Sequence, residues 1–140
     1  MIKVFEPDIT IKDKLAVYRA MSKKNISGTS PEIDKFEKSL SNYFDRKYVS
    51  TVSNGSSALD LALKSIDLND GDEVIVPSFT IISCLAAIIR AGGKPIFCDV
   101  DINSWNMRLS DVEKVITDKT RAILMVHTYG LVAEAKKISQ

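Results

Sequence analysis

The stretch TVSNGSSAL at residues 51–59, followed by GDEVIVP at residues 71–77, decides the fold of this chain. The first stretch runs from an apolar segment through a small, hydroxyl-rich turn into the start of a helix. The second ends in a β-branched run and a proline, a pattern typical of a strand buried in a parallel sheet. A strand-to-helix turn directs free backbone N–H groups and the positive end of the helix dipole at one point. That point suits a phosphate, so Gly55, Ser56 and Ser57 are candidates for a phosphate site.

The same turn also suits a second interpretation, an ordinary helix start in which asparagine, glycine and serine supply the cap. It has no Gly-Lys-Ser/Thr, as a nucleotide-binding P-loop would, and it lacks the G-x-G-x-x-G of dinucleotide-binding folds. These absences exclude the commonest nucleotide sites. A phosphate cradle and a plain helix cap both remain open on the residues alone.

Strand and helix patterns alternate outward from these stretches. Strands are predicted at residues 48–52, 73–76, 95–100 and 121–126, and helices at residues 9–21, 31–44, 57–66, 80–90, 110–116 and 132–140. Alternating strands and helices favour a mostly parallel α/β sheet flanked by helices. We predict a single domain, with a helical segment over residues 1–46 and an incomplete α/β core over residues 47–140.

The composition indicates an ordinary globular protein, with 45% hydrophobic and 26% charged residues among 140. A formal net charge of +1 gives no reason to expect nucleic acid or an anionic membrane as a partner. No apolar run approaches the roughly 20 residues of a spanning helix, and no signal-peptide core opens the chain. Cys84 and Cys98 lie in apolar surroundings, so we predict buried thiols in a cytoplasmic protein. With one histidine, no metal site is predicted.

Further candidates follow the other predicted strands, where ligands of open α/β sheets bind. The turn at residues 77–81 could place a side chain against a planar cofactor, although a helix cap is the simpler interpretation. His127 and Tyr129 end the fourth predicted strand, and a lone histidine is more often structural than catalytic. Asp99 and Asp101 are interpreted as turn formers. Trp105 is interpreted as a loop contact.

Five segments together resemble the DegT/StrS-type family of sugar-nucleotide aminotransferases, which depend on pyridoxal 5′-phosphate. They are Gly28 with FE at 36–37, SNGSSALDLAL at 53–63, GDEVIVPSFT at 71–80, GGKPIFCDVD at 92–101, and TRAI with VHTYG within 120–130. Each is weak alone, and their common order and spacing make the resemblance strong. The Ser-Asn-Gly turn is most similar to the perosamine synthase branch, which aminates a 4-keto-6-deoxy sugar on a nucleoside diphosphate.

The resemblance implies the N-terminal part of an aspartate-aminotransferase-type large domain, in a protein that forms a homodimer. It implies that Gly55, Ser56 and Ser57 bind the cofactor phosphate. Ile81 takes the position where the family commonly stacks an aromatic side chain on the pyridine ring, so an aliphatic ring contact is implied. The implied contacts with the sugar nucleotide are Asn25, Ser27 and Gly28.

In this family a lysine binds the cofactor covalently and an acidic residue pairs with the pyridine nitrogen. The resemblance places both after Gln140, and no lysine here lies in a matching context. We therefore predict no catalytic residue in this chain and expect it to be inactive alone, as the N-terminal part of a longer enzyme. The complete protein is expected to move an amino group, with glutamate as the expected donor, to a nucleotide-linked 4-keto-6-deoxy sugar.

Three alternatives stay open. A pyridoxal phosphate-dependent sugar dehydratase has the same fold but replaces the lysine. A non-catalytic remnant would bind a partner or have no activity. An unrelated α/β domain would bind a phosphate ligand without any cofactor.

Overall fold

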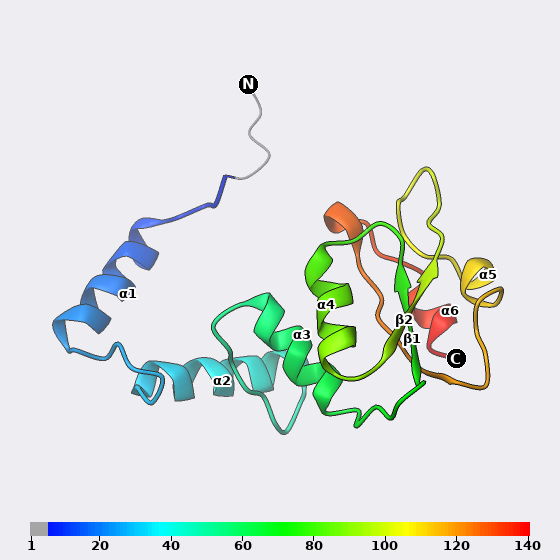
Figure 1. Ribbon diagram of the computed structural model, residues 1–140. Coiled ribbons are helices and arrows are strands. Elements are labelled where there is room, and N and C mark those ends of the chain that lie inside the picture. Colours follow the sequence, from blue (N-terminus) through cyan, green and yellow to red (C-terminus); the bar gives the residue numbers. More distant parts are fainter. Residues whose placement is uncertain (1–5) are drawn as a thin grey trace. The chain divides into compact units, whose positions relative to one another are not determined.

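The computed structural model describes residues 6–140, which divide between Thr51 and Val52 into two compact units. Residues 1–5 of the predicted helical segment lie outside the described residues. Within the described part, the first unit contains two helices and no strand. The second unit contains the sheet, and Figure 1 labels most of its elements.

In the first unit, α1 (Ile11–Ser22) and α2 (Pro31–Phe44) form close to where the sequence predicted helices. α1 begins with a capping box, in which Thr10 Oγ1 accepts the Asp13 N–H and the Asp13 carboxylate accepts the Thr10 N–H at 2.7 Å. α2 ends at Asp45, whose left-handed conformation terminates the helix. Neither helix contains a buried residue, so neither has a core of its own.

The second unit is built on a parallel sheet of three strands with the order β2-β1-β3. Its elements are α3 (Gly55–Lys64), β1 (Glu73–Pro77), α4 (Ile82–Arg90), β2 (Lys94–Cys98), α5 (Leu109–Val112), β3 (Thr120–Ile123), the 3₁₀ turn η1 (Thr128–Gly130) and α6 (Ala135–Ile138). Ile75 in the middle of β1 lies opposite Ile96 and Ile123. Each outer strand keeps one side without a neighbouring strand among residues 6–140.

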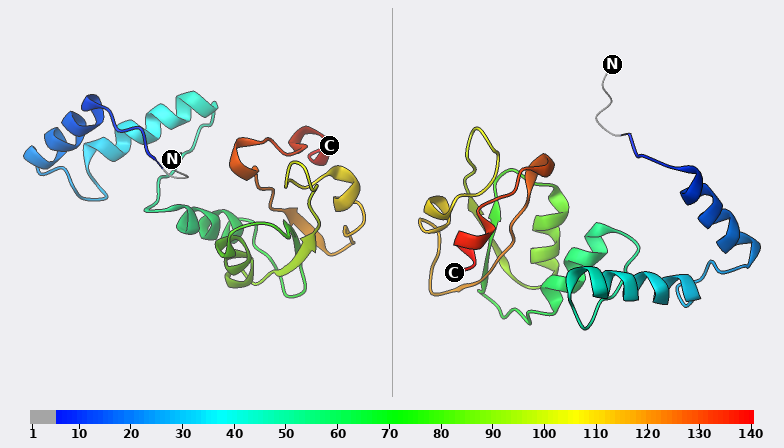
Figure 2. Two further views of the ribbon diagram at one scale, coloured as in Figure 1. Left: turned by 90° about the horizontal axis from the view of Figure 1, so that it is seen from above. Right: turned by 180° about the vertical axis from the view of Figure 1, so that it is seen from behind.

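All five residues of β1 are buried, because helices cover both faces of the sheet. On one face, Val74 and Val76 pack against α3 and α4. On the other face, Ile75 packs with Met107 and Val112. Figures 1 and 2 show α4 on one side of the sheet and α5 and α6 on the other. The predicted parallel α/β sheet flanked by helices is therefore confirmed.

The strand predicted at residues 48–52 is wrong, because that segment forms no strand. Both sides of β1 are occupied by β2 and β3. The Thr51 N–H donates to the Glu37 carboxylate at 2.7 Å instead of to another strand. The β-branched residues indicated an extended chain, but an extended chain becomes a strand only where a partner is available.

Two predicted helices are shorter than expected. The helix at residues 110–116 is reduced to α5, because the chain continues into turns through β-branched residues that have low helix propensity. The helix at residues 132–140 is reduced to α6, because the chain first makes a tight turn in which the Ala135 N–H donates to the Ala133 carbonyl at 2.7 Å and Glu134 has a non-helical backbone. The other predicted strands and helices form with small shifts at their ends.

Candidate functional site

The carboxyl ends of the three strands lie at one edge of the sheet, because the strands are parallel. The first turn of α4 lies there too, since it follows the turn after β1. Ser56 Oγ at the start of α3 donates to Ser83 Oγ in that first turn at 3.0 Å. This bond joins the predicted phosphate turn to the helix that follows the predicted turn at residues 77–81. Ligands of open α/β sheets bind at this edge.

The first turn of α3 offers two backbone N–H groups without a partner among residues 6–140. They belong to Gly55 and Ser56 and precede the first intrahelical bond. The Ser57 N–H is occupied, because Asn54 Oδ1 accepts it at 3.0 Å as the helix N-cap. A Cβ at Gly55 would meet no atom within 4 Å, so a ligand can approach the backbone there. Of the three amides in the prediction, two are available to an anion.

A cavity of about 330 Å³ lies between the segments that follow β1 and β3. Its walls are Phe79, Thr80, Ile81, Cys84, Val126, His127, Thr128 and Tyr129. Ile81 is the N-cap residue of α4 and exposes 66% of its surface, so it can contact a ligand. Thr80 Oγ1 donates to Cys84 Sγ at 3.2 Å, which orients the wall behind it. A mostly apolar lining with a few polar groups is typical of a small-molecule site.

His127 lies in the cavity wall that follows β3. Its Nδ1 accepts the Ala133 N–H, and its Nε2 has no partner among the described residues. A nitrogen that accepts a hydrogen bond carries no proton, so the neutral ring has its proton on Nε2. The ring therefore anchors the segment through one nitrogen and leaves a donor on the other.

Three aromatic side chains gather at the same edge, one from each segment that follows a strand. Trp105 contacts Phe79 and Tyr129 edge to face, with ring centroids 5.1 and 6.0 Å apart. The indole Nε1–H donates to the Ile102 carbonyl at 3.1 Å, which fixes the ring. The sequence predicted Trp105 as a loop contact but gave no sign of its neighbours, because they come from two other segments.

Sequence reasoning missed the pair of buried polar residues Asn106 and Thr128, which joins the segments after β2 and β3. The Thr128 N–H donates to Asn106 Oδ1 at 2.9 Å, and Asn106 Nδ2 donates to the Leu131 carbonyl at 3.0 Å. The Thr128 hydroxyl donates to the Trp105 carbonyl at 3.1 Å. Sequence reasoning also missed Ser83, although the first turns of α3 and α4 are expected to lie close together at the same edge of the sheet.

The aspartates after β2 have the turn-forming roles that the sequence predicts. Asp99 Oδ1 accepts the Val100 N–H at 2.8 Å. The Ser104 N–H, bonded to Asp101 Oδ1 at 2.9 Å, contributes most to holding the pKa of Asp101 below its usual range. Both aspartates are therefore committed to loop structure.

The two cysteines are free and buried, as predicted. Burial raises the pKa of the Cys98 thiol, which keeps it neutral. None of the helices in the described part of the chain is both long and apolar enough to cross a membrane.

Asn25, Ser27 and Gly28 lie in the first unit, in the connection between α1 and α2. Asn25 Nδ2 donates to Glu32 Oε1 at 3.0 Å, a bond that lowers the pKa of Glu32. Ser27 Oγ shares a hydrogen bond with Thr29 Oγ1 at 2.9 Å. A Cβ at Gly28 would meet no atom within 4 Å. The connection is a stable turn, and its assignment to the sugar nucleotide stays a prediction.

Residues 7–140 match the DegT/DnrJ/EryC1/StrS aminotransferase family. The chain belongs to this family. The predicted resemblance is therefore confirmed. Among curated relatives, the GDP-perosamine synthase of Escherichia coli O157:H7 is 42% identical over 98% of this chain and 38% of its own length. The dTDP-3-amino-3,6-dideoxy-alpha-D-galactopyranose transaminase of Aneurinibacillus thermoaerophilus is 36% identical over 94% of this chain and 37% of its own length. This family member thus spans less than two fifths of the length of these relatives.

Solved structures of aminotransferases share its fold. The aminotransferase from Psychrobacter cryohalolentis superposes with a TM-score of 0.87 at 34% identity, covering 95% of this family member and 34% of that chain. The PLP form of a putative sugar aminotransferase, Spr1654 from Streptococcus pneumoniae, superposes with a TM-score of 0.82 at 29% identity. The match covers 96% of this family member and 34% of that chain. The α/β architecture of this family member is therefore that of a sugar aminotransferase.

Proposed function

We propose that the complete protein is a pyridoxal 5′-phosphate-dependent aminotransferase that acts on a nucleotide-linked 4-keto-6-deoxy sugar. Family membership and the activities for which its relatives are named support this proposal. Glutamate is the proposed amino donor, and a homodimer is the proposed working form. The 140-residue chain contributes the phosphate side and one face of the cofactor site.

The residues present fit the phosphate of this cofactor. The free amides of Gly55 and Ser56 and the start of a ten-residue helix suit an anion. The Ser57 hydroxyl can add a donor. The cavity that Ile81 lines, about 330 Å³ in volume, lies at the lower end of the roughly 300–1,000 Å³ that ligand clefts enclose. Ile81 can pack on one face of the pyridine ring.

One observation carries the assignment: the 3.0 Å bond between Ser56 Oγ and Ser83 Oγ. It supports the proposal because it joins the start of α3 to the first turn of α4, whose N-cap residue Ile81 lines the cavity. A ligand with a phosphate one methylene away from an aromatic ring needs these two features side by side. When bound, such a cofactor supplies the electron sink for moving an amino group between donor and acceptor.

Within this chain, the proposed tasks are to hold the phosphate, orient the ring and exclude water from one ring face. No lysine lines the cavity among the described residues, so we expect no transamination by the chain alone. In the complete protein, Asn25, Ser27 and Gly28 are proposed to contact the sugar nucleotide. Their turn offers an amide, a hydroxyl and an open backbone for that purpose.

The test is binding of pyridoxamine 5′-phosphate, which has no aldehyde and so cannot react with surface lysines. Trp105, the only tryptophan, reports binding by its fluorescence because it contacts two residues of the cavity wall. In Ser56→Glu, a carboxylate replaces the hydroxyl beside the phosphate, and we expect affinity to fall at least about tenfold, or about 1.4 kcal/mol. The matched control is Ser110→Glu, at the start of α5, which should bind as the unaltered chain does.

Unchanged binding by Ser56→Glu, or no binding by the unaltered chain, would refute the cofactor assignment. Equal affinity for ribose 5-phosphate would instead indicate a general phosphate-binding domain. A dehydratase of the same fold would also bind the cofactor. Incubating the complete protein with a 4-keto-6-deoxy sugar nucleotide and glutamate separates the two enzymes, because only an aminotransferase yields an amino sugar.

A further inference from the structure

His127 is the only histidine of the chain, and its two ring nitrogens have different surroundings. Nδ1 accepts the backbone N–H of Ala133 at 3.1 Å. Nε2 has no partner among residues 6–140, and the residue lines the cavity beside Ile81. A backbone N–H can only donate, so it selects the neutral tautomer that carries its proton on Nε2.

The wall that contains His127 is held in place before any ligand arrives. Ala133 is buried and anchors the ring on one side. The next residue in the chain, Thr128, is buried and bonded to Asn106 through its N–H and to Trp105 through its hydroxyl. His127 itself is exposed, so its Nε2–H group is open to solvent and can donate to a ligand.

We propose that His127 is a ligand-binding residue whose Nε2–H group donates a hydrogen bond to the ring hydroxyl oxygen of the vitamin B6 phosphate. This inference rests on the proposed function, because it assigns a second contact to the same ligand. The hydrogen bond restricts rotation of the ring after the phosphate is bound. His127 thereby orients the ring, and its role needs no proton transfer.

The chemistry of the ligand separates this contact from the phosphate contact. The phosphate arm and the ring hydroxyl are on different ring carbons, on either side of the carbon that carries the aminomethyl group. The groups that bind the phosphate lie at the starts of α3 and α4, which Ser56 and Ser83 connect. A donor for the hydroxyl must therefore come from another element. His127, in the segment after β3, is the residue of the cavity wall whose ring carries an N–H donor.

Two substitutions separate the anchoring nitrogen from the donating one. In His127→Asn, the side-chain oxygen can replace Nδ1 and accept the Ala133 N–H, but nothing replaces Nε2. In His127→Gln, the longer amide can reach the position of Nε2 and donate. We expect His127→Asn to bind pyridoxamine 5′-phosphate about tenfold more weakly, which corresponds to about 1.4 kcal/mol. We expect His127→Gln to bind within about threefold of the unaltered chain, since one hydrogen bond remains.

Nitrogen NMR gives a readout that does not depend on activity. In an untagged chain the single imidazole gives one pair of ring nitrogen signals. We expect the Nε2-protonated tautomer in the free protein, and a shift of the Nε2 signal when pyridoxamine 5′-phosphate binds. Inorganic phosphate should occupy the start of α3 and leave the Nε2 signal in place.

Each outcome decides the inference. If the unaltered chain binds pyridoxamine 5′-phosphate and His127→Asn binds it equally well, the role of His127 is refuted while the cofactor assignment stands. If inorganic phosphate shifts the Nε2 signal as much, His127 belongs to the phosphate site and the ring contact is refuted. If the unaltered chain binds no pyridoxamine 5′-phosphate, the proposed function fails, and this inference fails with it.

Discussion

Asn54 sets the number of amides that the candidate phosphate site can use. Its side chain accepts the Ser57 N–H at 3.0 Å and so completes the first turn of α3. The Gly55 and Ser56 amides remain for a ligand. One residue thus both starts the helix and limits the site, because a cap and an anion compete for the same donors.

Replacing Asn54 by alanine should lower the free energy of unfolding by about 1 kcal/mol, because the N-cap bond is lost. Urea denaturation measures the change. Asn54→Asp is the matched control and should unfold near the unaltered midpoint, since aspartate caps equally well. Equal losses in both variants would show that the amide nitrogen of Asn54, bonded to Ser53 Oγ at 3.1 Å, matters more than the cap.

Gly93 occupies a position with no room for a side chain. A Cβ there would lie 2.8 Å from Leu68 Cδ1 and 3.4 Å from both Ile88 Cγ2 and Val74 Cγ2. We expect Gly93→Ala to destabilise the second unit by about 1–3 kcal/mol through overpacking, measured by thermal or urea unfolding. Gly55→Ala is the control, since its Cβ meets no atom within 4 Å. A neutral Gly93→Ala would mean that the Leu68 side chain moves aside without loss.

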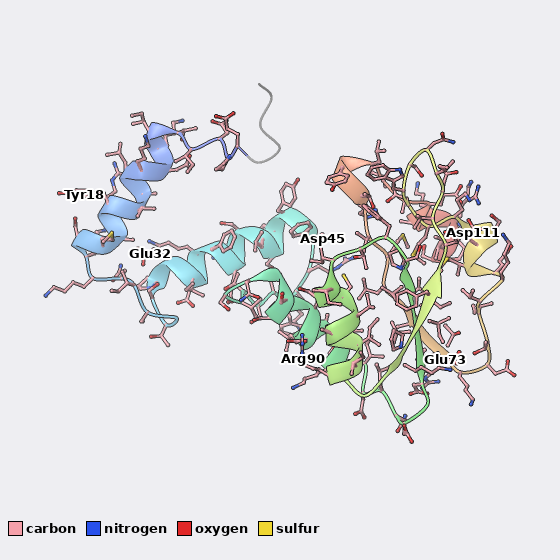
Figure 3. All side chains as sticks on the ribbon, turned by 45° about the horizontal axis from the view of Figure 1, so that its top comes forward. Tyr18, Glu32, Asp45, Glu73, Arg90 and Asp111 are labelled. Atoms are coloured by element: carbon pink, nitrogen blue, oxygen red, sulfur yellow. The ribbon has the colours of Figure 1, made fainter. Side chains whose placement is uncertain are left out.

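At the scale of elements, the short helix α5 depends on charge as well as packing. Its Asp111 is buried and accepts hydrogen bonds from Arg108 Nε at 2.6 Å and Lys114 Nζ at 2.8 Å (Figure 3 labels Asp111). The bond from Arg108, followed by that from Lys114, lowers the pKa of this carboxyl from 3.8 to about 2. A four-residue helix has little stability of its own, so these bonds to the residues on either side of Asp111 stabilise it, while Val112 packs against Ile75 of the sheet.

The lowered pKa of Asp111 predicts how stability depends on pH. Because the folded pKa lies below the unfolded one, its contribution is fully present above about pH 4 and is lost as the pH falls toward about 2. Other carboxyls titrate in the same window, so the measured quantity is the difference in thermal midpoint between the unaltered chain and Asp111→Asn. This difference should shrink from pH 5 to pH 2. A constant difference would show that the ion pairs do not contribute.

The sequence predicted an element well where residues close together in the chain determine it, and poorly where contacts with other segments do. β1 was predicted well because a β-branched run between a glycine and a proline specifies a buried strand by itself. The segment at residues 48–52 was predicted wrongly because a strand requires a partner. α6 begins late because the chain turns tightly between Ala133 and Ala135, which no periodicity reveals.

The candidate site likewise has features that the sequence predicted and features that it did not predict. The hydroxyl-rich turn at Gly55 and the shared edge of the sheet followed from pattern and from the rule for parallel strands. The capped amide of Ser57 and the bond between Ser56 and Ser83 did not, because side-chain geometry determines them. The tautomer of His127 also depends on one backbone N–H that only the fold provides.

At the scale of the whole molecule, the two units should differ in stability. β1 is buried throughout, whereas α1 and α2 contain no buried residue. We expect hydrogen exchange at the amides of α1 to be at least about a hundredfold faster than at those of β1, because few buried contacts oppose local opening. Mass spectrometry of exchanged peptides measures both units in one sample. Equal protection would show that the helices are covered in solution.

β2 and β3 each present a row of main-chain groups with no strand beside it among residues 6–140. Exposed rows of this kind can template cross-chain pairing, since any extended peptide completes them. Recovery of dispersed protein after refolding should therefore fall steeply as concentration rises. Dilution, or a lysine placed on an outer strand, would favour the monomer. Light scattering would measure how much protein aggregates instead of refolding.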